Sequence, residues 1–128
     1  MSKEISVTVN LSATKNGAQL LSNDSKTPDM AGNTFVQNVQ VINTTATTVS
    51  FGSVTASESI GRVKLKNLDS VNSVAFSTSS PANFSAATTG GFCTLPPGEF
   101  AYFPTRNGTL YGIAQAAAVD VLVCAVAM

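Results

Sequence analysis

Histidine is absent from this 128-residue sequence, and so is tryptophan. Without histidine the chain can form no Ser-His-Asp triad, no Cys-His dyad and no imidazole metal site. The only two cysteines, Cys93 and Cys124, lie far apart in the sequence and make no zinc-binding pattern. The sequence therefore favours a protein that is not an enzyme, with no catalytic, cofactor-binding or metal-binding residues.

Carboxylates are the remaining route to catalysis, because a glycosidase needs only two of them held close together. Most of the acidic residues lie in polar segments or turns, where exposed acids are ordinary. Asp24 and Asp29, with Asn23 beside them, offer oxygen ligands for calcium, but their spacing matches no calcium-binding loop. The seven acids are Glu4, Asp24, Asp29, Glu58, Asp69, Glu99 and Asp120.

Charge is also scarce, at 11% of the residues against an average of about 25%. Seven basic residues balance seven acidic ones, and no basic stripe of the kind that binds nucleic acid is present. Arg62, Lys64 and Lys66 alternate along an expected strand and therefore share one face. We interpret that face as a solvated outer surface and expect no nucleic-acid partner.

Hydroxyl side chains take the place of the missing charges, with 15 serines and 15 threonines. Such a surface costs less to desolvate than one covered with lysine and glutamate. Apolar residues make up 44% of the chain, which excludes the disordered class. The composition therefore favours a folded protein whose outer faces are partly covered by neighbouring subunits, and we expect a homo-oligomer.

No apolar run approaches the roughly 20 residues of a spanning helix, so we expect no membrane partner. The most apolar segment, 114–128, is interrupted by Asp120. Met1-Ser2-Lys3-Glu4 has none of the features of a signal peptide. We therefore expect synthesis in the cytoplasm, with Cys93 and Cys124 as buried free thiols.

The N-terminal third combines one clear strand with a long polar stretch. Residues 3–11 alternate between apolar and polar side chains, which predicts a half-buried strand. Residues 12–33 are rich in Ser, Asn, Asp and Lys, which predicts a long loop with room for one short edge strand at 18–21. Long loops are often functional, so this loop is a candidate arm for contacting a partner, with a plain surface loop as the alternative.

The remainder, residues 34–128, reads as short strands separated by turns. Asn67-Leu68-Asp69, Pro96-Pro97 and Asn107-Gly108 each mark a turn, and the last of these favours a hairpin. We count eight or nine strands in total, no helix and no internal repeat. The expected strands of this region are 35–42, 47–54, 60–65, 71–77, 92–95, 100–103, 109–114 and 118–127.

These strands predict an all-β protein that folds as a single antiparallel β-sandwich domain over residues 1–128. The jelly roll is the candidate topology. The N-terminal strand at 3–11 is expected to precede the loop at 12–33, and the core strands fill 34–128. Tyr102 and Tyr111, the only tyrosines, are expected to face a shared edge of the core.

The turns and final strands resemble small virion proteins of tailed bacteriophages. The resemblance rests on Asn67-Leu68-Asp69, on Pro97-Gly98-Glu99, and on the alternating strand Val119-Asp120-Val121-Leu122-Val123. It covers about residues 60–128, and the polar segment 77–91 departs from the charged or aromatic residues usual in that group. The resemblance implies a virion structural protein, either a capsid decoration protein or a neck or tail component, with no catalytic residues to carry over.

Two functions follow as hypotheses. The first is a structural protein, made in the host cytoplasm and located in the virion, that assembles with coat or tail subunits such as the major capsid protein. The second is a carbohydrate- or receptor-binding module, for which Tyr102 or Tyr111 would supply an exposed ring. A hydrolase would require clustered carboxylates, which the sequence does not indicate.

Overall fold

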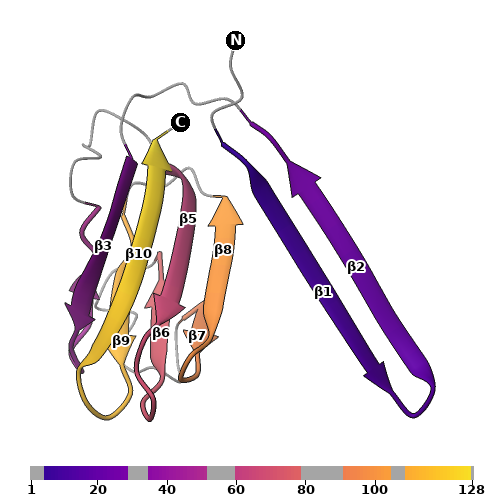
Figure 1. Ribbon diagram of the computed structural model, residues 1–128. Helices are drawn as coiled ribbons and strands as arrows, with labels where there is room; N and C mark the ends of the chain where they lie inside the picture. Colours follow the sequence, from indigo (N-terminus) through magenta and orange to yellow (C-terminus); the bar gives the residue numbers. More distant parts are fainter. Residues whose placement is uncertain (1–4, 29–34, 52–59, 79–90, 105–108, 128) are drawn as a thin grey trace. The chain divides into compact units, whose positions relative to one another are not determined.

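The computed structural model describes residues 5–28, 35–51, 60–78, 91–104 and 109–127 (Figure 1). Over these residues the chain forms ten strands and no helix, and every strand pairing is antiparallel. The all-β prediction is confirmed. The chain divides into two compact units, Met1–Ala31 and Gly32–Met128.

The first unit is a long β-hairpin made of β1 (Val7–Lys15) and β2 (Ala18–Lys26). The two strands pair along their whole lengths, from Val7 opposite Lys26 to Lys15 opposite Ala18. Asn16 and Gly17 join them with φ angles of 52° and 80°. Two consecutive positive φ angles identify a type I′ turn, whose twist matches that of the flanking strands.

This hairpin corrects the loop predicted at 12–33. Residues 12–15 continue β1, residues 18–26 form β2, and residues 29–33 lie outside the described part of the chain. The prediction of a single sandwich domain over residues 1–128 also differs from the structure, because the sandwich strands begin at Phe35. The strand predicted at 3–11 is present from Val7 onward, but it is exposed along almost its whole length and not half-buried. Its partner is the polar strand β2 and not a strand of the core.

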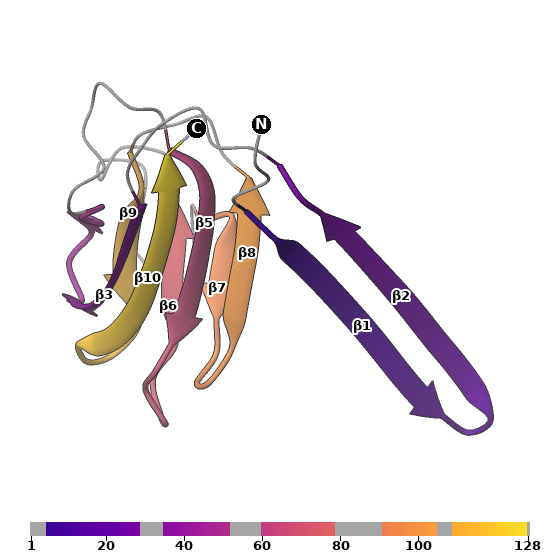
Figure 2. The same ribbon diagram turned by 45° about the horizontal axis from the view of Figure 1, so that its top comes forward.

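The second unit contains the other eight strands, in two four-stranded sheets (Figures 1 and 2). The first sheet has the order β3-β10-β5-β8 and the second has the order β4-β9-β6-β7. The strands are β3 (Phe35–Ile42), β4 (Thr47–Thr48), β5 (Ile60–Asn67), β6 (Val74–Ser77), β7 (Cys93–Leu95), β8 (Phe100–Pro104), β9 (Tyr111–Ala114) and β10 (Val119–Ala127).

The strand pairings are nested, which defines the jelly-roll topology. Strand β6 pairs with β7, β5 with β8, β4 with β9 and β3 with β10. The chain therefore behaves as one long antiparallel hairpin of eight strands, folded so that its successive pairs fall into two facing sheets. The prediction of a β-sandwich with jelly-roll topology agrees with this strand order.

The core lies between the two sheets and is built by strict alternation along the strands. Every second residue of β10 is buried, from Val119 to Ala127. Leu65 of β5 packs in the same cluster as Phe76 of β6, and both are completely buried. At Gly112, a Cβ atom would lie 3.1 Å from Cγ2 of Ile42 and 3.2 Å from Cε1 of Phe76, so a side chain there would press against both core residues.

Some predicted boundaries shift. Of the strand expected at 47–54, residues 52–54 lie outside the described part of the chain; within 47–51 only β4 is a strand, and the buried residues Val49 and Phe51 follow it without strand geometry. The strand expected at 71–77 begins only at Val74, because residues 68–73 form the connection from β5. The hairpin turn predicted at Asn107-Gly108 lies outside the described residues.

Candidate interaction surfaces

The outer face of the β3-β10-β5-β8 sheet carries the basic residues singled out in the sequence. Arg62, Lys64 and Lys66 alternate along β5 with the buried Val63 and Leu65, so all three point away from the core. The register places Lys64 opposite Tyr102 and Lys66 opposite Phe100 on the neighbouring strand β8. The prediction that the three cations share one outer face is confirmed.

Each of two cations on this face contacts an aromatic residue of β8. The Arg62 guanidinium donates a hydrogen bond from Nη1 to the Tyr102 hydroxyl at 2.9 Å. Nζ of Lys64 lies 5.9 Å from the centre of the exposed Phe100 ring, within the range of a cation–π interaction. The β5–β8 half of the face is therefore cationic and aromatic.

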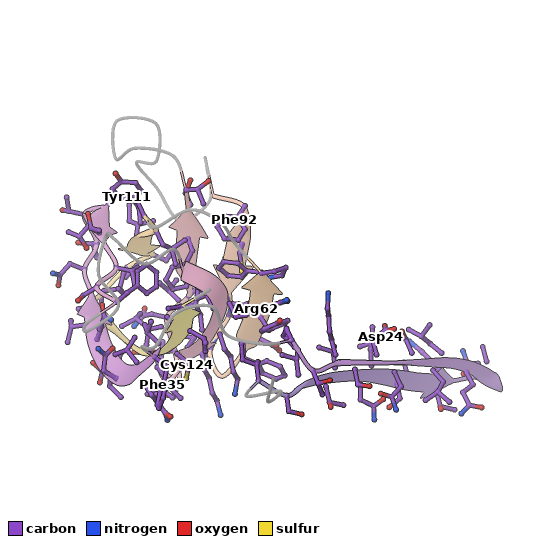
Figure 3. The ribbon with its side chains drawn as sticks, turned by 90° about the horizontal axis from the view of Figure 1, so that it is seen from above. Asp24, Phe35, Arg62, Phe92, Tyr111 and Cys124 are labelled. Atoms are coloured by element: carbon purple, nitrogen blue, oxygen red, sulfur yellow. The ribbon has the colours of Figure 1, made fainter. Side chains whose placement is uncertain are left out.

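The other half of the same face, on β3 and β10, is mostly apolar. Phe35 and Val39 of β3 are 70% and 57% exposed, and Val41 is exposed beside them. Cross-strand pairing sets Val39 against Leu122 of β10 and Val41 against Asp120. We call this half the apolar outer face; its outward residues are Phe35, Gln37, Val39, Val41, Asp120, Leu122, Cys124 and Val126. Figure 3 shows Phe35 and Cys124 on one side of the sandwich and Tyr111 on the other.

Sequence reasoning missed the apolar outer face. Strand β3 has apolar residues at both odd and even positions, so its sequence alone does not say which side faces the core. Only its inward residues, such as Val36 and Ile42, pack toward the core. Exposed apolar side chains gathered on one face are typical of protein–protein contact sites. No charged residue interrupts β3, although lysine and proline commonly guard edge strands.

The hairpin carries a second exposed apolar surface. The register places Val7, Val9, Leu11 and Ala13 of β1 and Leu20 of β2 on one face of the ladder. We call this set the apolar hairpin face. Leu11 is 58% exposed, and Val9 and Leu20 are exposed as well. The opposite face is mostly polar, with Ser, Thr, Asn and Gln and one leucine, Leu21. The hairpin is therefore amphipathic, although Lys15, Asp24 and Lys26 lie on the same face as the apolar side chains.

The acidic residues of the described segments are distributed over separate elements. Asp24 lies on β2, Glu99 follows the turn at Gly98, and Asp120 is exposed on β10. Of the two aspartates considered as calcium ligands, Asp24 stands opposite Val9, and Asp29 is outside the described residues. Among the residues that the structure describes, no three potential metal ligands gather.

Asp69 is instead part of a turn that organises the fold. Its Oδ1 atom accepts hydrogen bonds from the backbone N–H of Asn72 at 2.7 Å and of Val71 at 2.6 Å. These two bonds lower the pKa of the Asp69 carboxyl below its ordinary value. The Asn67-Leu68-Asp69 sequence therefore builds the β5–β6 connection and supplies no free carboxylate for chemistry.

The Pro97-Gly98-Glu99 sequence has a similar structural role. The Glu99 N–H donates to the carbonyl oxygen of Pro96 at 3.0 Å, and Gly98 has a φ of 78°. Proline at the second position and a positive φ at the third are the features of a type II turn. Two of the three sequences on which the virion resemblance rests are thus turns that lead the chain from one strand to the next, and the third belongs to β10.

The two tyrosines lie on different sheets, which corrects the expectation of a shared edge. Tyr102 projects from the outer face of β8, where its hydroxyl accepts a hydrogen bond from Arg62. Tyr111 belongs to β9 in the second sheet and packs with Ala75 and Ile113 on that sheet's own outer side. A single ligand groove using both rings is therefore not formed.

Both cysteines are free thiols and only partly buried, not buried as expected. Cys93 packs against the main core, and burial raises the pKa of its thiol. Cys124 lies on the apolar outer face, between Gln37 of β3 and Lys64 of β5. In the described part of the chain, no helix is long and apolar enough to cross a membrane.

Comparison with models of protein families, with curated proteins and with solved structures finds no match for this chain.

Proposed function

We propose that this chain is a non-enzymatic structural subunit of a virion, which assembles with copies of itself and with other coat or tail subunits. Capsid decoration is the role we favour within that class, with the major capsid protein as the partner; a neck or tail position is the alternative. The observation that carries the proposal is the pair of exposed apolar surfaces, one on the hairpin and one on the β3–β10 half of the sandwich.

Those surfaces suit assembly because strand register gathers exposed apolar side chains on one face of each. A two-stranded hairpin is at best marginally stable in water by itself, so covering its apolar side chains would stabilise it. Jelly rolls occur in viral capsid proteins as well as in lectins. The resemblance of the turns at 67–69 and 97–99 to small phage virion proteins supports the viral choice.

Particle composition and solution size together test this function. Mass spectrometry of purified virions encoded by the same genome is expected to detect the chain at a fixed number of copies per particle. Mass photometry of the isolated protein is expected to show oligomers, or a monomer that sediments with capsids or tails. A strict monomer that binds neither particle and is missing from virions would overturn the proposal.

A second function is favoured by one observation, the exposed ring of Phe100 two residues from Tyr102 on the outer face of β8. Aromatic faces of this kind stack against sugars, so the alternative is a carbohydrate- or receptor-binding module. A glycan array tests it, with Tyr102→Ala as the site variant and Tyr111→Ala as the control in the opposite sheet. Binding that Tyr102→Ala abolishes and Tyr111→Ala preserves would favour this function over assembly.

A further inference from the structure

We infer that the β5–β8 half of the outer face binds an anionic saccharide, a sugar chain that carries carboxylates. The inference rests on the second function proposed above, the carbohydrate-binding module, and adds to it the charge of the sugar. It does not depend on the apolar surfaces that support assembly. We call the site the cationic patch; it consists of Arg62, Lys64 and Lys66 of β5 and Phe100 and Tyr102 of β8.

Two lysines of the cationic patch lie beside the Phe100 ring. Lys66 stands directly opposite Phe100 in the β5–β8 ladder, and Nζ of Lys64 lies 5.9 Å from the centre of the ring. The Phe100 side chain is nevertheless 62% exposed, so the lysines leave much of the ring open to solvent. An exposed aromatic ring offers the flat apolar surface on which the C–H face of a sugar stacks. Stacking and positive charge are therefore available at one place.

The three cations of the patch have no acidic partner. Arg62 donates to the neutral hydroxyl of Tyr102, and Lys64 contacts the Phe100 ring. Among the residues that the structure describes, none of the three cations forms an ion pair with a carboxylate. The Nε atom of Arg62 is also buried without a hydrogen-bond partner. Alternate residues of a strand lie about 6.8 Å apart, so these like charges repel one another, and a bound carboxylate would offset that repulsion.

Acidic side chains approach the cationic patch at one end only. Exposed Asp120 of β10 lies diagonal to Lys66, and Glu99 immediately precedes Phe100. The other two cations have uncharged partners on both neighbouring strands: Val126 and Cys124 on β10, and Pro104 and Tyr102 on β8. The positive charge that no acid offsets therefore includes Lys64, the lysine that contacts the exposed ring.

The small number of cations favours a saccharide over a nucleic acid. Proteins that bind nucleic acid use a basic stripe that contacts many phosphates, whereas this patch has three cations in a chain without net charge. A saccharide needs fewer charges, because ring stacking and hydrogen bonds to its hydroxyl groups add to the affinity. Arg62 uses one N–H group on Tyr102, and a guanidinium has five, so it has donors left for a sugar.

Matched probes test the charge and the ring of the ligand separately, by calorimetric titration of the full-length chain at low salt. Trigalacturonic acid and trisialic acid carry a carboxylate on every unit. The methyl ester of trigalacturonic acid keeps the sugar rings without the charge, and hexaglutamate keeps the carboxylates without sugar rings. We expect an acidic saccharide to bind roughly tenfold or more tightly than the ester or the peptide, and to bind more weakly as salt is added.

Each probe has an outcome that contradicts the inference. Failure of both acidic saccharides to bind would overturn it. Equal binding of the ester would show that charge does not select the ligand, and equal binding of hexaglutamate would show that the sugar does not. A single-stranded oligothymidylate that binds more tightly than either saccharide at the same salt concentration would assign the cationic patch to nucleic acid instead.

Substitutions locate the binding on the sheet. Lys64→Gln removes the charge beside the ring and Phe100→Ala removes the ring; both side chains are exposed, so the fold is expected to keep its stability. We expect each variant to weaken binding of the acidic saccharide by about fivefold or more, and Lys64→Arg to restore most of it. Lys15→Gln in the hairpin is the charge control. Phe35→Ala, at the opposite edge of the sheet, is the ring control. Controls that weaken binding as much as the site variants would place the ligand elsewhere.

The outcomes also separate this inference from the proposed functions. A neutral glycan whose binding Tyr102→Ala abolishes would keep the carbohydrate-binding module and reject the acidic ligand. A chain that binds no saccharide at all would reject both. Neither result would bear on the virion subunit, which is tested by particle composition and solution size.

Discussion

The side-chain amide of Asn67 donates a hydrogen bond to the carbonyl oxygen of Leu95, 3.0 Å away, and so fastens the end of β5 to the end of β7 in the opposite sheet. The same amide donates to the carbonyl oxygen of Asn72 at 2.9 Å. The side-chain oxygen of Asn67 accepts a hydrogen bond from the backbone N–H of Asp69, also at 2.9 Å. Asn67 is completely buried, so these three bonds replace contacts that water would otherwise make.

Replacing Asn67 with alanine should therefore destabilise the sandwich strongly. The variant leaves two carbonyl oxygens and one N–H without their partner in a site that excludes water. We expect a loss of about 3 kcal/mol in the free energy of unfolding, measured by urea denaturation. Asn67→Asp keeps the acceptor for Asp69 but loses both donated bonds and buries a charge, so it should be at least as damaging at neutral pH.

An exposed asparagine provides the control for this substitution. Asn43 lies after β3, and its backbone carbonyl oxygen accepts a hydrogen bond from the N–H of Ala114. An alanine at position 43 would keep this backbone hydrogen bond. Asn43→Ala should change the free energy of unfolding by less than about 0.5 kcal/mol. Equal effects at Asn67 and Asn43 would show that the buried amide does not hold the sheets together.

The carboxyl of Asp69 should make stability depend on pH in the acid range. Because the N–H groups of Asn72 and Val71 lower its pKa in the folded chain, folding favours the charged form. The charged carboxyl therefore contributes its full share of the stability above the pKa of Asp69 in the unfolded chain, about 4. This share is lost as the pH falls through the lower pKa of the folded chain. Urea denaturation of the wild type and Asp69→Ala should therefore differ at pH 7 and converge near pH 2.

Asp69→Asn separates hydrogen bonding from charge. The amide oxygen can still accept from the backbone, but the group no longer titrates, so the variant should lose this part of the pH dependence. If the free energy of unfolding falls as much between pH 7 and pH 2 in Asp69→Asn as in the wild type, the acid sensitivity belongs to other carboxyls.

The sandwich could be predicted from the sequence because its signals are local. Alternation in residues 119–127 and the turn residues at 67–69 and 96–99 each specify a structure without reference to distant residues. The buried position of Asn67 could not be predicted in this way. Its partners Asn72 and Leu95 come together only after the two sheets close, and an asparagine in a turn sequence is ordinarily exposed.

The hairpin was missed for a different reason. Asn16-Gly17, the sequence most typical of a two-residue hairpin turn, was present and followed an alternating strand. The polar composition of β2 outweighed it, because strands are usually recognised by their apolar face. Neither exposed apolar surface is visible in composition alone: the hairpin face depends on register, and the outer face depends on which side of β3 meets the core.

Gly98 should be required for its backbone conformation and not for space. No atom lies within 4 Å of a Cβ built there, but its φ of 78° is unfavourable for residues with a side chain. Gly98→Ala should cost about 1–2 kcal/mol of stability, measured by thermal or urea unfolding. Gly98→Asn, which tolerates the left-handed region better, should cost less than the alanine variant; the reverse order would argue against strain as the cause.

The two free thiols should react at different rates with iodoacetamide in dilute native protein. Cys93 packs against the core, and its raised pKa leaves less of the reactive thiolate at any given pH. Cys124 projects from the outer side of β10. We expect Cys124 to be alkylated several times faster at pH 8, followed by peptide mass spectrometry, with Cys93→Ser and Cys124→Ser used to assign each rate. Unfolding in urea should bring the two rates together, whereas a Cys93 that reacts as fast as Cys124 in the native chain would contradict its place against the core.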